Sequence, residues 1–404
     1  MNYKLGFVIL ATVLLLTSCS KDPEQNIDEQ LTEILLAASE TGTIDFFKFP
    51  SSNDYSAIPQ DPKNPITQEK VNLGALLYHE TGLAMNPMHS ESEGHYSCAS
   101  CHFASAGFQA GRHQGIADGG IGFGNNGEGR EPNPLYDLDE LDVQPIRSPS
   151  AMAGAWQEVM LWNGQFGATG MNEGTDALWP DDTPIATNRL GYQGLEIQAI
   201  AGLGVHRMTI DDNDLILNNY KPLFDDAFSD IDLSERYTRE FAGLAIAAYE
   251  RTLLPNQAPW QKYLGGSYNA LTDQEKRGAM LFFNEAKCSS CHTGPALNSM
   301  DFHALGMKDL FETTELTYGA GLESDANLGR YSFTKEESDK YKFKVPQLYN
   351  LADSPFFGHG ASFRTVREVI EYKNAGQKEN SNVEDSYLSS QFTPLNLTSE
   401  QIDD

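Results

Sequence analysis

The sequence is poor in basic residues, and this shortage argues against one large class of function. Only 28 of its 404 residues are Lys or Arg, against 57 Asp or Glu, which gives a formal net charge of −29. Because a phosphate backbone is bound by clustered basic side chains, the balance argues against a nucleic-acid-binding protein. Hydrophobic residues still make up 40% of the chain. That share is too high for a disordered chain, so the acidic residues belong to a folded surface.

Long hydrophobic runs are also lacking, apart from one near the N-terminus. The run from Leu5 to Leu16 is shorter than the roughly 20 residues of a membrane-spanning helix. It follows the basic Lys4 and ends in Leu-Thr-Ser-Cys at Cys19, which is typical of a secretory signal that ends in a bacterial lipobox. The alternative is an ordinary signal peptide with an incidental cysteine. We expect a lipoprotein signal peptide over 1–19 and an exported protein, on the periplasmic side of the cell envelope, anchored to the membrane through Cys19.

Cysteine is scarce, and the four cysteines after Cys19 all belong to two C-x-x-C-H motifs. This motif attaches c-type haem: the two thiols bind the haem vinyl groups and the following His ligates the iron. A redox-active dithiol does not need the His, a zinc site would have to join two distant motifs, and a disulfide across two residues is strained. We therefore expect two covalently bound c-type haems, held by Cys98, Cys101 and His102 and by Cys288, Cys291 and His292.

An internal repeat surrounds the two motifs. Helices are expected over 67–78 and 272–283, the second with a capping box of Thr272 and Glu275, and in the first Leu73, Leu76 and Leu77 share one face. The expected fold is mostly α-helical, with two tandem cytochrome c-like haem domains, few short strands and long loops. The expected boundaries are a polar tether and lead-in over 20–65, an N-terminal haem domain over 66–255 and a C-terminal haem domain over 256–404. Residues 397–404 read as the capped start of a helix, which favours a truncated C-terminal domain.

Further blocks of sequence resemble the bacterial di-haem cytochrome c peroxidases, a family that includes the MauG-like maturation enzymes of methylamine dehydrogenase. The blocks are Leu161-Trp162-Asn163-Gly164, Glu196-Ile197-Gln198-Ala199, and the segments 344–350 and 354–360. The resemblance implies that hydrogen peroxide binds at the N-terminal haem. It also implies that the C-terminal haem accepts electrons from a small donor protein such as a cytochrome c, and that Trp162 couples the two haems.

The chain departs from this family where peroxide is expected to react. The family carries an acid/base Glu at the position of Arg207. A guanidinium stays protonated, so Arg207 is expected either to stabilise a developing negative oxygen or to hold a haem propionate. His206 is the expected base, and Gln198 matches a polar residue beside the peroxide-binding haem.

The sixth iron ligands remain open on sequence alone. For the first haem the candidate is His113, with a permanently open position as the favoured alternative. For the second haem the resemblance points to Met307, Tyr372 or Lys373, and direct counting places Lys373 at the ligand position. A calcium ion between the domains is a further expectation of the resemblance, although Ser148 replaces one of its Asn ligands. The acidic segment 136–142 is either a docking face for a basic donor or a solvated loop.

Three functions are compatible with these residues. The first is an exported di-haem peroxidase that reduces hydrogen peroxide to water with electrons from a small redox donor. The second is a MauG-like oxidase that acts on a protein or organic substrate, which the missing acid/base Glu favours. The third is a di-haem cytochrome that only transfers electrons.

Overall fold

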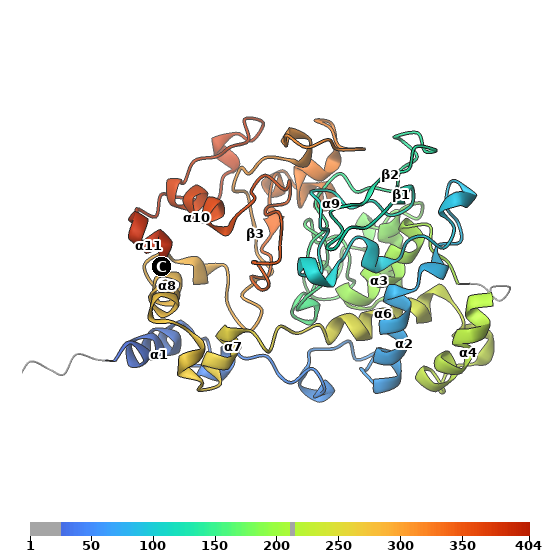
Figure 1. The fold of residues 1–404 in the computed structure, drawn as a ribbon, viewed down its shortest axis with the longest axis horizontal. Helices are drawn as coiled ribbons and strands as arrows, with labels where there is room; N and C mark the ends of the chain where they lie inside the picture. Colours follow the sequence, from blue (N-terminus) through green and yellow to red (C-terminus); the bar gives the residue numbers. More distant parts are fainter. Residues whose placement is uncertain (1–25, 211–214) are drawn as a thin grey trace, which may run out of the picture.

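The computed structural model describes residues 26–210 and 215–404 (Figure 1). The predicted signal peptide and Cys19 lie outside the described residues. Among the helices of the described ranges, none combines the length and the hydropathy of a membrane span.

One lobe of the molecule is a helical bundle that precedes and follows the first motif, at the right of Figure 1. It is built from α2 (Gln68–His79), α3 (Gly194–Val205), α4 (Leu215–Ala227), α5 (Leu233–Arg236) and α6 (Arg239–Arg251). Helix α6 packs against both α2 and α3. Two glycines permit this approach: a Cβ on Gly74 would lie 1.9 Å from the Ala245 carbonyl oxygen, and one on Gly243 would lie 2.5 Å from the Ile200 side chain.

The second lobe, at the left of Figure 1, contains the second motif. Its helices are α1 (Ile27–Ala38), α7 (Pro259–Leu264), α8 (Asp273–Phe283), α10 (Val366–Ala375) and α11 (Ser399–Asp403). Helix α1 packs against α8, where Leu31 and Leu35 are buried with Phe47 and Phe283. Helix α1 is therefore packed on the second lobe, within the range 20–65 for which the sequence predicts a polar tether and lead-in. The apolar face of this helix is the reason, because burying it against α8 removes it from water.

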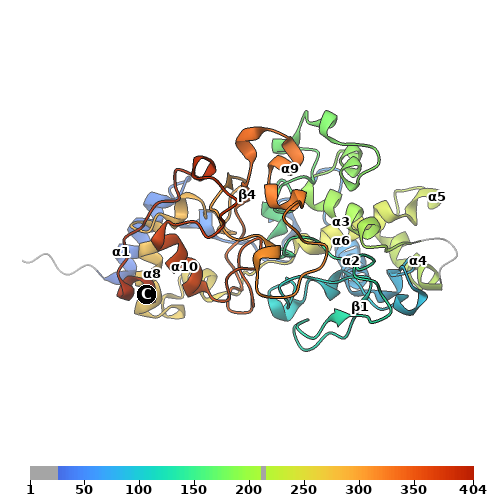
Figure 2. The same cartoon turned by 90° about the horizontal axis from the view of Figure 1, so that it is seen from above.

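Strands are few and short, as expected. Strand β1 (Gly120–Ile121) pairs antiparallel with β2 (Glu131–Pro132), with Gly120 opposite Pro132. Strand β3 (Phe302–His303) pairs antiparallel with β4 (Phe343–Lys344), with Phe302 opposite Lys344. The short helix α9 (Tyr331–Thr334) and many single-turn 3₁₀ segments interrupt long loops. These loops fill the space between the two lobes (Figure 2), which confirms a mostly helical fold with few short strands.

The repeated helices before the motifs are confirmed, with one error. Thr67 caps α2, and Thr272 forms the predicted capping box with Glu275 at the start of α8. Each helix contacts the turn that carries the following C-x-x-C-H. Leu76, however, is 49% exposed, so the buried face of α2 is narrower than predicted. At the other end of the chain α11 is a capped helix as expected, and it packs on α8.

A buried ion pair joins α3 to α6 and yields a test of the fold. The Arg251 guanidinium donates to both carboxylate oxygens of Glu196, at 2.6 and 2.9 Å, and both side chains are almost inaccessible. Glu196→Gln leaves the guanidinium buried without its counter-charge. We expect the free energy of unfolding, measured in urea, to fall by about 3–5 kcal/mol.

The matched control is the exposed pair of Arg189 and Asp181 on the surface. Asp181→Asn should leave the free energy of unfolding nearly unchanged, because solvent screens exposed pairs. Equal losses in the two variants would contradict the structural role given to Glu196 and Arg251.

Candidate haem sites and the cavity between them

Both C-x-x-C-H motifs fold into the same local structure. The cysteines lie on a 3₁₀ turn, and the His backbone N–H donates to the carbonyl of the first cysteine, at 3.1 Å for His102 and 3.0 Å for His292. Each imidazole then uses Nδ1 for a carbonyl a few residues later: His102 contacts Phe108 at 3.1 Å and His292 contacts Leu297 at 2.9 Å. A ring nitrogen fixed to a carbonyl leaves Nε2 for a metal.

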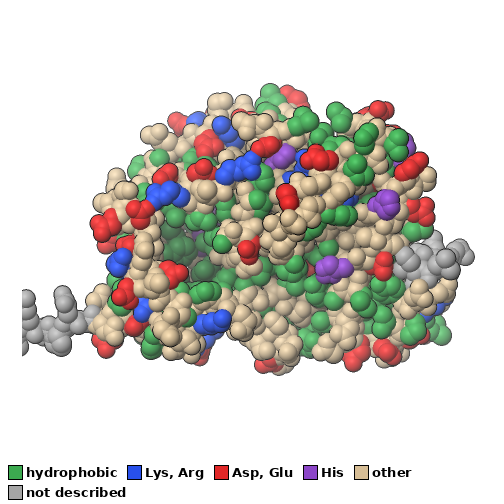
Figure 3. Space-filling view, in the orientation of Figure 1, with side chains coloured by type: hydrophobic (Ala, Val, Ile, Leu, Met, Phe, Trp, Pro, Cys, Tyr) green, Lys and Arg blue, Asp and Glu red, His purple; other side chains and the backbone are tan. Residues whose placement is uncertain are grey.

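The two motifs open into one cavity of about 1510 Å³, which all six motif residues line. Figure 3 shows the molecular surface hollowed in the left part of the view, over the second lobe, with hydrophobic side chains in the recess. Burial raises the pKa of the Cys98 thiol to about 12 and of the Cys101 thiol to about 11. Burial also lowers the pKa of His102, and that of His292 to about 4. Both imidazoles are therefore neutral at pH 7, which is the form that ligates iron.

Buried positive charges on the cavity wall test whether these residues fit haem. Arg147 donates to the carbonyls of Arg112 and Ala110 and to the Gln109 amide oxygen, and Lys344 donates to Gln157. No carboxylate of the described residues pairs with either cation, and burial lowers the pKa of Arg147 to about 9 and that of Lys344 to about 7. A buried cation needs an anion beside it. The propionates of haem are anions, so the two side chains fit haem in this cavity.

Trp162 lies on the cavity wall where the two lobes meet. Its indole Nε1 donates to the carbonyl of Arg147 at 2.8 Å, and its own carbonyl accepts from the backbone N–H of Lys344 at 2.8 Å. The ring lies edge-on to His359, with ring centroids 6.3 Å apart. Trp162 thus contacts segments before and after the second motif, and its role in coupling the two motifs stays a prediction.

Helix α3 and its C-terminal cap contribute two polar side chains to the cavity wall beside the first motif. Gln198 and, at the C-terminal cap, His206 line the cavity. The His206 Nδ1 lies 2.9 Å from a carboxylate oxygen of Asp142. Burial acts to lower the pKa of His206, but the charge of Asp142 and the hydrogen bond to it outweigh burial, so the pKa is raised. The pair presents the other ring nitrogen of His206 as a group that can accept or donate a proton.

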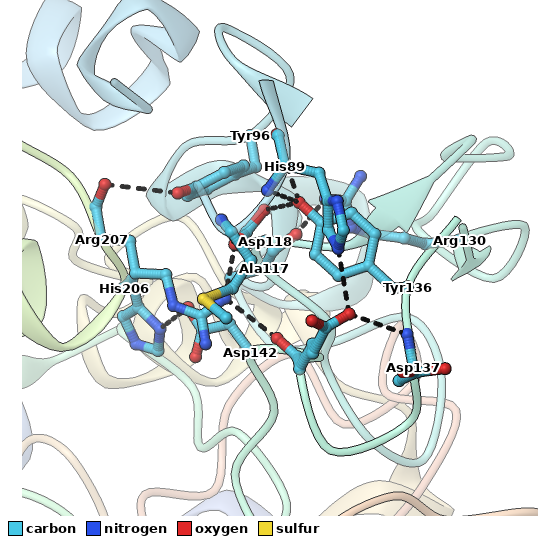
Figure 4. Close-up of polar contacts among 12 residues, drawn as sticks. His89, Tyr96, Ala117, Asp118, Arg130, Tyr136, Asp137, Asp142, His206 and Arg207 are labelled. Atoms are coloured by element: carbon cyan, nitrogen blue, oxygen red, sulfur yellow. Dashed lines mark hydrogen bonds and ion pairs between the residues drawn. The ribbon is translucent and has the colours of Figure 1, made fainter. Parts of the chain in front are cut away.

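Arg207 belongs to a network of polar contacts with Asp118 and Tyr136, which Figure 4 shows. Its guanidinium donates to Asp118 at 2.5 Å and to the Glu140 carbonyl at 2.9 Å, and the described residues that line the cavity do not include it. Asp118 is fully buried and also accepts from Tyr136 at 2.6 Å. The guanidinium of Arg207 therefore neutralises a buried carboxylate, and the roles expected for it, anion stabilisation or propionate binding, stay predictions.

The acidic segment 136–142 contributes three side chains to this network. Neither a docking face nor a solvated loop, the two expectations for this segment, includes such contacts. Tyr136 holds Asp118, Glu140 lies 2.9 Å from His89, and Asp142 lies against His206. Asp137 and Asp139 face solvent. A Tyr, a Glu and an Asp spaced four and two residues apart in a loop give no periodic signal, so their pairing partners were not predictable from the sequence.

Two of the candidate sixth ligands, Met307 and Lys373, line the cavity, whereas His113 does not. His113 is buried, its Nε2 lies 2.8 Å from the Leu316 carbonyl oxygen, and its ring contacts Phe356. It lies off the cavity wall that the described residues form. Met307 and Lys373 line the cavity near the second motif, and burial lowers the pKa of Lys373 to about 8.

The calcium site has no support from side-chain geometry. Within residues 26–210 and 215–404, no three His, Cys, Asp or Glu side chains converge as they do around a metal ion. Calcium therefore stays a prediction of the resemblance alone.

The paired motifs and their shared cavity define a c-type architecture with two attachment sites. The family model of the di-haem cytochrome c peroxidases matches residues 68–269, and the chain belongs to this family. The cytochrome c peroxidase Ccp of Escherichia coli is 30% identical over 75% of this chain. MauG of Methylophilus methylotrophus is 26% identical over 81% of this chain. The chain spans about half the length of the first relative (52%) and 77% of the second.

Solved structures show the same fold. A MauG-like protein associated with microbial copper homeostasis superposes with a TM-score of 0.58 at 22% identity, and the match covers 88% of this chain and 91% of that one. The di-haem peroxidase BthA of Burkholderia thailandensis gives a TM-score of 0.50 at 17% identity, over 88% and 87% of the two chains.

The two attachment sites can be counted separately. Replacing both cysteines of one motif by Ala, either Cys98 and Cys101 or Cys288 and Cys291, should halve the covalently bound haem, because each motif supplies its own pair of thiols. The measurement is the haemochrome absorbance per chain together with the mass of the intact protein. Ser289→Ala keeps both thiols of the second motif and should keep the full haem content. Retention of full covalent haem after loss of either cysteine pair would contradict the assignment.

Proposed function

We propose that the chain is a di-haem peroxidase that reduces hydrogen peroxide to water with two electrons taken one at a time from a small donor protein. The observation that carries the proposal is the single cavity that connects both motifs and holds the His206–Asp142 pair at one of them. Haem, when bound, supplies the one-electron redox chemistry and the cleavage of the O–O bond. Breaking that bond to give two waters also consumes two protons, and these must pass through side chains.

His206 is the proton-transferring residue in this proposal. Its neutral ring takes a proton from hydrogen peroxide and returns it to the departing oxygen, which leaves as water. Asp142 holds the ring in one orientation and stabilises its protonated form. Gln198, two turns earlier on the same cavity wall, can orient the peroxide by hydrogen bonding. The pair takes over the role of the Glu that the resemblance led us to expect at position 207.

The surface charge supports a basic donor. The chain carries a net charge of −29, and acidic side chains are spread over the face seen in Figure 3. Opposite charge speeds the encounter of two proteins. We propose a small basic cytochrome c as the electron donor, and an exported, lipid-anchored location through Cys19 in the periplasm, where such donors are found.

The first test removes the proton-transferring side chain. His206→Ala should lower kcat/KM for hydrogen peroxide, assayed with reduced cytochrome c, by about 10²–10⁴-fold. The control is His89→Gln, because His89 forms a similar pair with Glu140 but lies off the cavity wall, and this variant should keep wild-type activity.

The outcomes of this assay separate the functions. Equal activity of the His206 variant and the wild-type protein would refute the role of His206. Reaction with peroxide that is not followed by oxidation of cytochrome c would favour a MauG-like oxidase. No spectral response to peroxide at all would favour a cytochrome that only transfers electrons.

The second test is the pH dependence. Neutral His206 is the active form, so kcat/KM falls as the pH drops through its pKa, which Asp142 raises above the ordinary value near 6.5. Asp142→Asn removes the charge that raises it and leaves burial, which lowers it. The acidic limb of the kcat/KM profile should therefore move to lower pH in this variant. If the acidic limb of the kcat/KM profile stays at its wild-type pH in Asp142→Asn, a group other than His206 controls that limb.

A further inference from the structure

Helix α10 forms the cavity wall beside the second motif through a single stripe of side chains. The stripe lies at spacings of three, four and seven residues, which place side chains on one helix face, and it consists of Val366, Val369, Ile370 and Lys373. Valine and isoleucine have no atom that binds iron. Lys373 is therefore the one member of this stripe that can act as a ligand.

Tyr372, the neighbour of Lys373 in the sequence, is buried in an apolar cluster and does not face the cavity. Adjacent helical residues point about 100° apart, and Tyr372 points into the apolar core of the lobe. Its hydroxyl donates to the Leu305 carbonyl at 2.5 Å. Its ring packs against Phe363 and Phe392, with centroids 5.1 and 5.2 Å away. Reaching an iron atom would require it to leave both contacts.

Met307 lines the same cavity but packs against a different element. Its sulfur lies 3.3 Å from where a Cβ on Gly358 would stand. This turn directly precedes His359, the residue whose ring contacts Trp162. Met307 also belongs to the apolar cluster around Tyr372 and Phe363. Its thioether therefore packs against the Gly358 turn and this apolar cluster.

Lys373 faces the second motif itself. Its ammonium lies close enough for its charge to act on Cys288, His292 and His303. It lies 5.8 Å from the Phe392 ring centroid, and no carboxylate of the described residues pairs with it. A long basic side chain is thus held against a metal-attachment motif with no salt-bridge partner to explain its position.

We propose that the Nζ amine of Lys373 is the sixth ligand of the iron that His292 holds, opposite the imidazole. The amine donates an electron pair but accepts none back, so it stabilises the ferric state more than the thioether of a Met ligand does. The second haem is then six-coordinate at rest, and peroxide is directed to the first. The inference rests on the proposal of two haems but not on peroxidase activity.

The experiment is spectroscopy of the purified ferric holoprotein. Electron paramagnetic resonance and near-infrared magnetic circular dichroism distinguish an amine opposite histidine from a thioether or a phenolate. One of the two haems of the wild-type protein should give the amine signature. A thioether or phenolate signature on the haem of the second motif would overturn the proposal without the need for any variant.

Variants then assign the signature to a residue. Lys373→Ala should abolish the amine signature and open a position that binds added imidazole, and Lys373→Met should replace it by a thioether signature. Tyr372→Phe and Met307→Leu should leave the spectrum unchanged. An amine signature that survives in Lys373→Ala, or a ligand that is lost in Met307→Leu, would refute the assignment.

Haem content separates this inference from the proposed function. It is measured on every variant by haemochrome absorbance, and two haems per chain show that the variant is folded and loaded. A wild-type protein that is fully loaded with haem but shows no cytochrome c peroxidase activity would refute the proposed function. The assignment of Lys373 as ligand would still be decided by the spectra alone.

Discussion

The constraint on which the rest of the structure depends is the positive charge buried around the cavity. Arg147 and Lys344 are nearly inaccessible to water, and each is held by carbonyl or amide oxygens rather than by a carboxylate. Removing a cation from water costs several kcal/mol unless an anion compensates for it. These side chains therefore make the cavity a site for anionic groups. The two lobes and their connecting loops place such cations around both motifs, so loading of the cavity and stability of the fold are linked.

The same constraint explains why loops rather than helices dominate the region between the lobes. A helix satisfies its backbone groups internally, but the buried cations and imidazoles need carbonyl oxygens that are free to accept. Arg147 donates to the carbonyls of Arg112 and Ala110, which lie in the loop after the first motif and not inside a helix. The His102 and His292 rings are fixed in the same way by Phe108 and Leu297. Irregular backbone is what supplies these acceptors.

The parts predictable from the sequence were those with a local signal. The C-x-x-C-H motifs, the capping box at Thr272 and the helix that follows it depend on residues within a few positions of one another, and the structure contains that helix and its cap. The role of Arg207 depends on Asp118, far away in the chain, and the orientation of His206 depends on Asp142. Such pairings are set by tertiary contacts between loops, which have no periodicity. The packing of helix α1 was not predictable for the same reason, because its partner α8 lies far away in the sequence.

Under the proposed function, opposite walls of one cavity carry different chemistry. The wall of α3 offers an amide and a His–Asp pair, groups that can bind peroxide and move protons. The wall of α10 offers valine, isoleucine and a single amine, which provide an apolar setting and a ligand but no relay for protons. Peroxide reduction needs protons and electrons at the same atom, whereas electron entry needs only electrons. The asymmetry of the walls therefore supports the proposal of peroxide chemistry at the first motif and electron entry at the second.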